Sequence, residues 1–139
     1  MNKKNESVCS HDSDAAIIHL TRQAYNNKNF RTEIWTGRYM QAALMSIGLR
    51  SETGVKMHEY ADMMIRVESG YARVYMGQVQ HDLKYAGNVS AGDAVFIASG
   101  TWNNIVNASN RELKLSIVYS PPQLHRGSVY RTKNECSDD

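Results

Sequence analysis

The chain has 139 residues, of which 42% are hydrophobic and 22% charged, and its formal net charge is +2. This length suits one domain that folds without disulfides or metal, and the scattered basic residues form no concentrated face for nucleic acid. No apolar run approaches the about 20 residues of a transmembrane helix, and residues 1–14 lack the apolar stretch of a signal peptide. We therefore expect a cytoplasmic globular protein with no nucleic-acid or membrane partner.

Polar segments at the two ends are expected to be tails, residues 1–14 and 134–139, around one domain of residues 15–133. The two cysteines, Cys9 and Cys136, lie in these segments. Two cysteines so placed do not make a disulfide framework. We expect free thiols in a reducing compartment.

The first half of the chain alternates short apolar stretches with turns. Ile17–Leu20 is predicted to pair as a short strand, with one helical turn over Thr21–Tyr25. Tyr39–Ile47 alternates with period two, and its apolar residues on both faces predict a strand that is covered on both sides. Val55–His58 is predicted to form another strand.

The second half of the chain contains further short strands. Ser69-Gly70 between two apolar stretches indicates a hairpin, because glycine supplies the positive φ of a tight turn. Pro121-Pro122 ends the last strand, since proline has no backbone donor. Eight or so short strands and no long amphipathic helix predict an all-β sandwich or barrel. The strands expected in this half cover Met63–Glu68, Tyr71–Met76, Ala94–Ala98, Ile105–Val106 and Leu113–Tyr119.

Two motifs choose between sandwich and barrel. The first has Gly54-Val55-Lys56-Met57-His58 followed by residues 62–70, and the second is Gly92-Asp93-Ala94 followed by Gly100-Thr101-Trp102. In residue types and spacing they resemble the paired motifs of the cupin superfamily. The similarity covers roughly residues 17–135 and is strongest to small bacterial cupins often labelled mannose-6-phosphate isomerase-like. It implies a single-domain double-stranded β-helix, the cupin or jelly-roll barrel.

The resemblance also implies where a metal would bind. In such cupins the first motif supplies two ligands two residues apart and then a Glu or Gln, and the second motif supplies a His. The matching positions here are Lys56, His58, Met63 and Asn103, with Asp62 as the nearest acidic side chain. An ammonium repels a divalent cation, and thioether and amide groups bind Zn, Mn or Fe weakly. We expect a degenerate metal site and no cofactor. The alternative is a divalent transition metal at low occupancy on His58, with Asp62 or Asn103.

Strand alternation places Lys56 and His58 on one face, pointing into the barrel. The leading hypothesis is a protein that binds a small metabolite, with an anion favoured by the Lys56 ammonium. The residues expected to contact it are Lys56, His58, Met63, Trp102 and Asn103. An alternative for Lys56 is a tip that reaches solvent at the barrel mouth.

Two other functions stay open. One is a metal-dependent enzyme of the sugar isomerase or dioxygenase type that uses His58 with replacement ligands, so whether the protein is an enzyme is undecided and no catalytic residue is assigned. The other is a structural or regulatory dimer without a ligand. The resemblance also implies pairing through an added N-terminal strand, which covers an exposed sheet edge. We therefore expect a homodimer through Ile17–Leu20.

Overall fold

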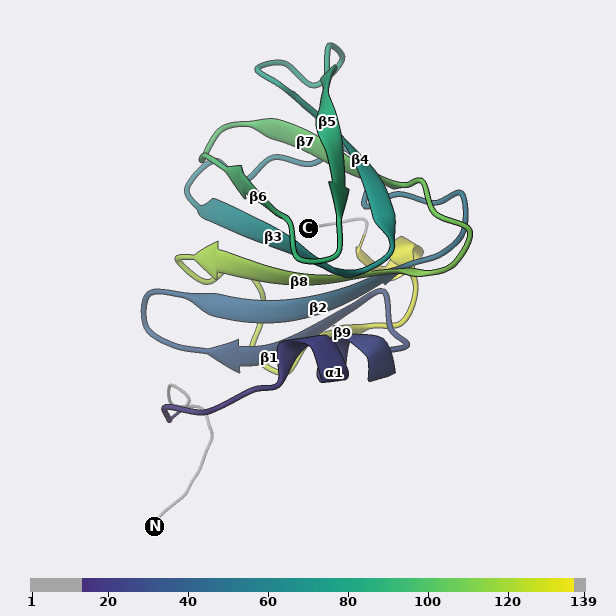
Figure 1. Ribbon diagram of the computed structural model, residues 1–139. Helices are drawn as coiled ribbons and strands as arrows, with labels where there is room; N and C mark the ends of the chain where they lie inside the picture. The colour runs from purple at the N-terminus through teal and green to yellow at the C-terminus, as the bar shows by residue number, and fades with distance from the viewer. Residues whose placement is uncertain (1–13, 137–139) are drawn as a thin grey trace.

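Two antiparallel sheets enclose the core of this protein, as the computed structural model of residues 14–136 shows (Figure 1). The larger sheet has six strands in the order β6-β3-β8-β2-β1-β9, and the smaller has three in the order β5-β4-β7. One short helix lies against the larger sheet. The expected single-domain, all-β double-sheet barrel is confirmed.

The elements follow one another along the chain with short connections. In order they are α1 Leu20–Asn26, β1 Arg31–Thr36, β2 Gln41–Ile47, β3 Asp62–Ser69, β4 Tyr71–Gly77, β5 Lys84–Ser90, β6 Ala94–Ile97, β7 Trp102–Asn107, β8 Leu113–Ser120, β9 Val129–Tyr130 and the 3-10 helix Lys133–Cys136.

Strand alternation fills the space between the sheets with apolar side chains. On β3 the inward residues Met63, Ile65 and Val67 are buried, and they alternate with Met64 and Arg66 on the outer face. Neighbouring strands follow the same pattern, because directly paired residues share a face. Each fully buried aliphatic side chain contributes about 1.5–3 kcal/mol to folding. This shared core fixes which residues of each strand face the barrel interior.

Helix α1 covers part of the outer face of the larger sheet, and a buried carboxylate attaches it there. Glu68 accepts hydrogen bonds from Thr21 of α1, Ser116 of β8 and Arg66 of β3, each 2.6 Å long. At the end of the helix, Lys114 donates to the carbonyl of Asn27. The expected two-sided covering of β2 is therefore achieved by this helix over part of the strand.

The predicted strand Ile17–Leu20 is wrong. Residues 14–19 have no strand pairing, and α1 already begins at Leu20. The amide of Gln23 donates to the carbonyl of His19, so this segment leads into a helix. Ile17 is 89% exposed, because no sheet edge lies against it.

The predicted strand Val55–His58 is also wrong. Only Lys56 makes a bridge there, to Asn103 of β7. Gly54 just before it has φ of +97°, a left-handed conformation that interrupts an extended strand. Conversely, strands β1, β5 and β9 were not predicted, since their sequences are mixed or polar rather than alternating.

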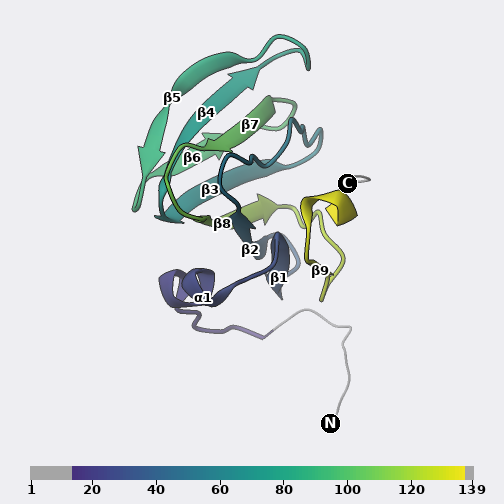
Figure 2. The same ribbon diagram turned by 90° about the vertical axis from the view of Figure 1, so that its right-hand side faces the viewer.

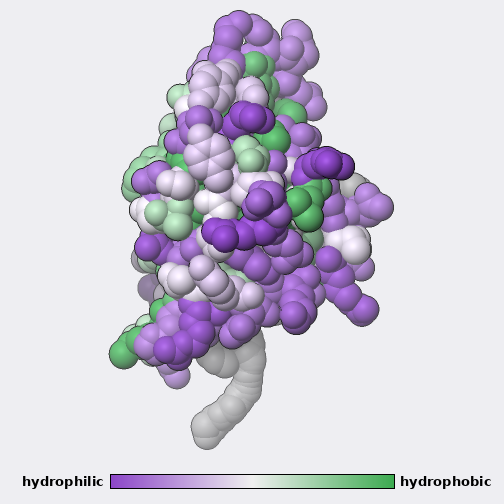
Figure 3. All heavy atoms as spheres, turned by 45° about the vertical axis from the view of Figure 1, so that its right-hand side comes forward, coloured by the Kyte–Doolittle hydropathy of each residue, from purple (hydrophilic) through white to green (hydrophobic). Residues whose placement is uncertain are grey.

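The C-terminal part of the described chain returns to the larger sheet, where β9 pairs with β1 (Figure 2). The 3-10 helix continues to Cys136, beyond the expected domain boundary at residue 133. Cys9 lies outside the described residues. Among residues 14–136, no helix has the length and apolar character needed to cross a bilayer. The face drawn in Figure 3 is largely hydrophilic, with hydrophobic residues in small groups.

Candidate functional site

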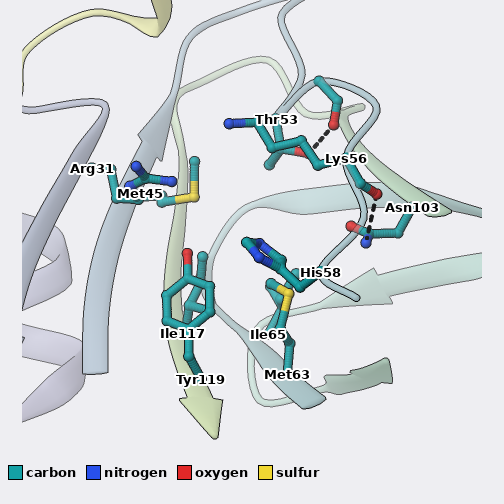
Figure 4. A pocket seen from close by; sticks show the side chains of 11 residues that line it. Arg31, Met45, Thr53, Lys56, His58, Met63, Ile65, Asn103, Ile117 and Tyr119 are labelled. Carbon is teal, nitrogen blue, oxygen red and sulfur yellow. Dashed lines mark hydrogen bonds between the residues drawn. The ribbon is translucent and has the colours of Figure 1, made fainter. Parts of the chain in front are cut away.

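A pocket opens between the two sheets at the position where the two motifs meet (Figure 4). It contains about 370 Å³ of space not filled by atoms, part of which is open to solvent. The lining residues are Arg31, Met45, Thr53, Gly54, Lys56, His58, Met63, Ile65, Asn103, Ile117 and Tyr119.

The irregular segment before β3 is attached to β7 by a series of hydrogen bonds. Thr53 donates its amide to the carbonyl of Ile105 at 2.9 Å and accepts the amide of the same residue on its hydroxyl at 3.0 Å. Lys56 and Asn103 exchange two backbone bonds, of 3.0 and 2.8 Å. The Asn103 side chain also donates to the carbonyl of Lys56 at 3.2 Å. These bonds hold the Lys56 backbone against the barrel wall without a regular strand.

Two cationic side chains reach the pocket from opposite sides. Arg31 comes from β1 and is 3% exposed, and its guanidinium carbon lies 4.9 Å from the ring centroid of Tyr130. Such a cation–π contact is favourable and stronger when desolvated. Lys56 enters from the irregular segment, and its Nζ atom is buried, so its tip does not reach solvent. The pocket is therefore lined by two cationic side chains.

His58 points into the pocket beside the Tyr119 ring, which it meets edge-on (Figure 4). Burial lowers the pKa of His58 below its ordinary value of 6.5. A hydrogen bond with Gln123 acts in the opposite direction, and the charges of Lys56 and Arg31 lower the pKa further. The neutral imidazole is accordingly the stable form at neutral pH, with one nitrogen as donor and the other as acceptor.

A buried glutamine positions the loop that carries Gln123. Gln41 of β2 is fully buried, and its carbonyl oxygen accepts the amides of Gln123 and Leu124 at 3.0 and 2.9 Å. Its amide nitrogen donates to Thr36 and to the carbonyl of Leu124. All four hydrogen-bonding positions of this amide are used. The segment after β8 is thereby held where the Gln123 side chain reaches His58.

The donor set of the pocket fits a first-row divalent metal poorly. His58 is the one imidazole lining it, and its neighbours are an ammonium, a guanidinium and a thioether. The Asn103 amide nitrogen is engaged by the carbonyls of Lys56 and Thr101. In the range 14–136, no three His, Cys, Asp or Glu side chains are grouped as metal ligands. Two fixed positive charges oppose a further cation here.

Four of the five residues expected to bind a ligand line the pocket: Lys56, His58, Met63 and Asn103. Trp102 does not line it; Trp102 is the first residue of β7 and pairs with Gly77 of β4. The candidate metal ligand Asp62 is exposed at the start of β3 and accepts the amide of Ser99 at 2.9 Å, on the opposite side of the strand from Met63.

Sequence reasoning missed most other residues of the site, among them Arg31, Tyr119 and Gln123. Tyr119 had a usable signal, because it continues the inward alternation of Leu115 and Ile117. Arg31 had none, since an arginine near the start of a polar strand is typically solvated. Gln123 depends on the loop contact with Gln41, which no local pattern reveals.

The comparisons with known proteins agree with this architecture. No family model matches the chain. The BH2720 protein of Bacillus halodurans is 35% identical and superposes with a TM-score of 0.88 over 95% of this chain and 100% of that one. The uncharacterized protein YrkC of Bacillus subtilis (strain 168) is 36% identical over 117 residues, 84% of this chain and 63% of YrkC. This chain therefore spans less than two thirds of that relative's length.

An RmlC-like cupin from Shewanella frigidimarina shares the fold, with 19% identity and a TM-score of 0.55 over 67% of this chain and 76% of that one. The two sheets and the pocket between them thus have the fold of a cupin barrel. With 35% identity over the full length of BH2720, this chain belongs to the same family as that protein.

Proposed function

We propose that this protein binds a small anionic metabolite inside the cupin barrel, without a tightly bound metal. The observation that carries the proposal is the presence of two cationic side chains, Arg31 and Lys56, in a pocket whose other walls are mostly apolar. A buried anion is costly unless opposite charge compensates it. In this pocket the protein supplies that compensation itself, where a metal ion supplies it in a metal-containing cupin.

The remaining lining residues favour a ligand with a small apolar part. Met45, Met63, Ile65 and Ile117 offer hydrocarbon and thioether surface. Neutral His58 adds one directional hydrogen bond. A short carboxylate suits this arrangement, with its charged group toward the two cations and its carbon chain toward the methionines. Inorganic phosphate shares the charge without the apolar part.

A metal-dependent isomerase or dioxygenase is not favoured by any contact in the pocket, and similarity to mannose-6-phosphate isomerase-like cupins is an analogy at the level of the fold. A purely structural role predicts that no small anion stabilises the protein. The same experiment therefore separates the proposal from that alternative.

The test is thermal unfolding at constant ionic strength with acetate, oxalate or inorganic phosphate replacing chloride. A ligand that binds only the folded state stabilises it by about 2.7 kcal/mol at a concentration of 100 Kd. We expect a saturable rise in Tm for at least one of these anions. Lys56→Met should abolish it while keeping most of the side-chain volume. An equal rise in the Lys56→Met protein, or none in the parent, contradicts the proposal.

Two controls sharpen this experiment. Lys84→Met removes an ammonium whose side chain is 77% exposed and does not line the pocket, so it should leave the anion response intact. Asp138 and Asp139 lie outside the described residues, and their carboxylates are potential competitors for a cationic site. A chain shortened to residue 136 is therefore titrated in parallel.

A further inference from the structure

A continuous row of apolar side chains crosses the outer face of the larger sheet. Phe96 of β6 pairs with Met64 of β3, Met64 pairs with Val118 of β8, and Val118 pairs with Ala42 of β2. Directly paired residues point to the same side of a sheet. Phe96 is 75% exposed, and the other three are partly exposed. At about 4.8 Å between strands, the row spans about 15 Å.

Helix α1 covers the adjoining part of this face and leaves the row open. On β2, Leu44 and Ser46 are buried beside the helix, whereas Ala42 is not. By alternation Met40 continues the same face beyond Ala42, and it is 46% exposed. A phenylalanine with three quarters of its surface in water, aligned with further apolar side chains, is unusual for a face that stays solvated.

We propose that a second copy of this chain packs on this row, face to face, about a twofold axis near Met64. Asp62 and Arg66 lie two residues on either side of Met64 on the same strand face. A twofold axis that passes Met64 in the plane of the interface and runs across the strands reverses the direction of β3 in the second copy. It therefore sets the Asp62 of each copy opposite the Arg66 of the other, twice in one isologous interface.

The side chains have the reach and the free groups for this arrangement. Sheets that pack face to face lie about 10 Å apart with strand directions within about 30°. Arg66 uses only Nη1 for Glu68, which leaves other guanidinium donors for a second carboxylate. Asp62 binds the Ser99 amide through Oδ1, which leaves Oδ2. The face is thus apolar along the row, and its charges at Asp62 and Arg66 are complementary to those of a second copy.

Two other occupants fit less well. Residues 1–13 are almost entirely polar, with Met1 and Val8 as their aliphatic side chains, and offer little to cover an apolar row. Pairing through residues 17–20 would use Ile17, which belongs to neither the row nor a strand. Each of these becomes a distinct outcome of the test.

The test is sedimentation equilibrium of the full chain and its variants over a wide concentration range. We expect the parent chain to dimerise reversibly. Phe96→Asp, at a position exposed in the single chain, should raise the dimer dissociation constant at least about thirtyfold, as for a central interface residue. Asp62→Asn keeps an acceptor for the Ser99 amide but removes the charge, and should weaken the dimer about threefold. Circular dichroism checks that both variants stay folded.

Matched controls separate the row from other surfaces. Val79→Asp adds the same charge at a 45% exposed position outside the row and should leave the dissociation constant unchanged. Ile17→Asp tests the N-terminal segment in the same way. The proposal is overturned by a parent chain that is monomeric throughout. It is equally overturned by a dimer that tolerates Phe96→Asp, or by one that Ile17→Asp alone dissociates.

Discussion

The imidazole of His58 stands edge-on to the phenol ring of Tyr119, with ring centroids 5.4 Å apart and an interplanar angle of 75°. This is a preferred geometry for aromatic pairs. Tyr119 is itself buried on β8, so the ring that supports His58 is immobilised by the core. With Gln123 bonded to the same imidazole, His58 is a hydrogen-bonding group with a lowered pKa beside two cationic side chains.

We expect the pKa of His58, followed by NMR titration, to lie below 6.5 and to rise when an anion binds. Without an anion, the pKa of His58 is lower in the folded state than in the unfolded chain. Just below pH 6.5, His58 therefore takes up a proton in the unfolded chain but not in the folded one. The stability due to this group is complete above pH 6.5 and is lost as the pH falls. His58→Gln should remove this component, and a pKa above 6.5 without anion contradicts it.

We expect purified protein to carry well under one equivalent of transition metal, measured by elemental analysis after dialysis. The reason is electrostatic, because a divalent cation beside His58 would be repelled by Lys56 and Arg31. Stoichiometric iron, manganese, nickel or zinc that disappears in His58→Ala would show that this interpretation of the donor set is mistaken.

Gln41→Leu should destabilise the protein by about 2–4 kcal/mol in chemical denaturation, because it leaves the backbone amides of Gln123 and Leu124 without their acceptor. Loss of the Gln123 contact should also lower the pKa of His58 further, since that hydrogen bond raises it. Gln23→Leu is the matched control on the exposed side of α1 and should change neither quantity. Unchanged stability in Gln41→Leu would contradict the role assigned to this amide.

Glu68→Gln should cost about 1.5–3 kcal/mol, because it removes the charge of a buried carboxylate that accepts several hydrogen bonds, while its ion-pair partner Arg66 is partly exposed. Burial by itself disfavours the carboxylate, but hydrogen bonds from Ser116, Thr21 and Arg66 bring the pKa of Glu68 below its ordinary 4.5. The corresponding stability is present above pH 4.5 and is lost as the pH falls through the folded-state value. Equilibrium unfolding against pH measures it, with exposed Glu59→Gln as the control.

Much of the candidate site could be predicted from the resemblance to the cupin motifs. That resemblance implied that Lys56, His58, Met63 and Asn103 lie around one pocket, and strand alternation added that Lys56 and His58 share a face. The prediction failed for the secondary structure that carries them, because Gly54 with its positive φ replaces the expected strand by an irregular segment. Side-chain hydrogen bonds to Thr53 and Asn104 then supplement the few backbone bonds that attach this segment to β7.

The sequence by itself determined the strand alternation and the turn glycines, and hence an all-β fold, and its resemblance to the cupin motifs selected the barrel. Only the tertiary structure decided that Arg31 joins Lys56 in the pocket and rests on Tyr130, 99 positions further along the chain. It also decided that α1 leaves the row through Phe96 and Met64 uncovered. The physical reason is the same in both cases. Alternation is a property of consecutive residues, whereas barrel closure and helix docking depend on which distant strands pair and where the shared core places them.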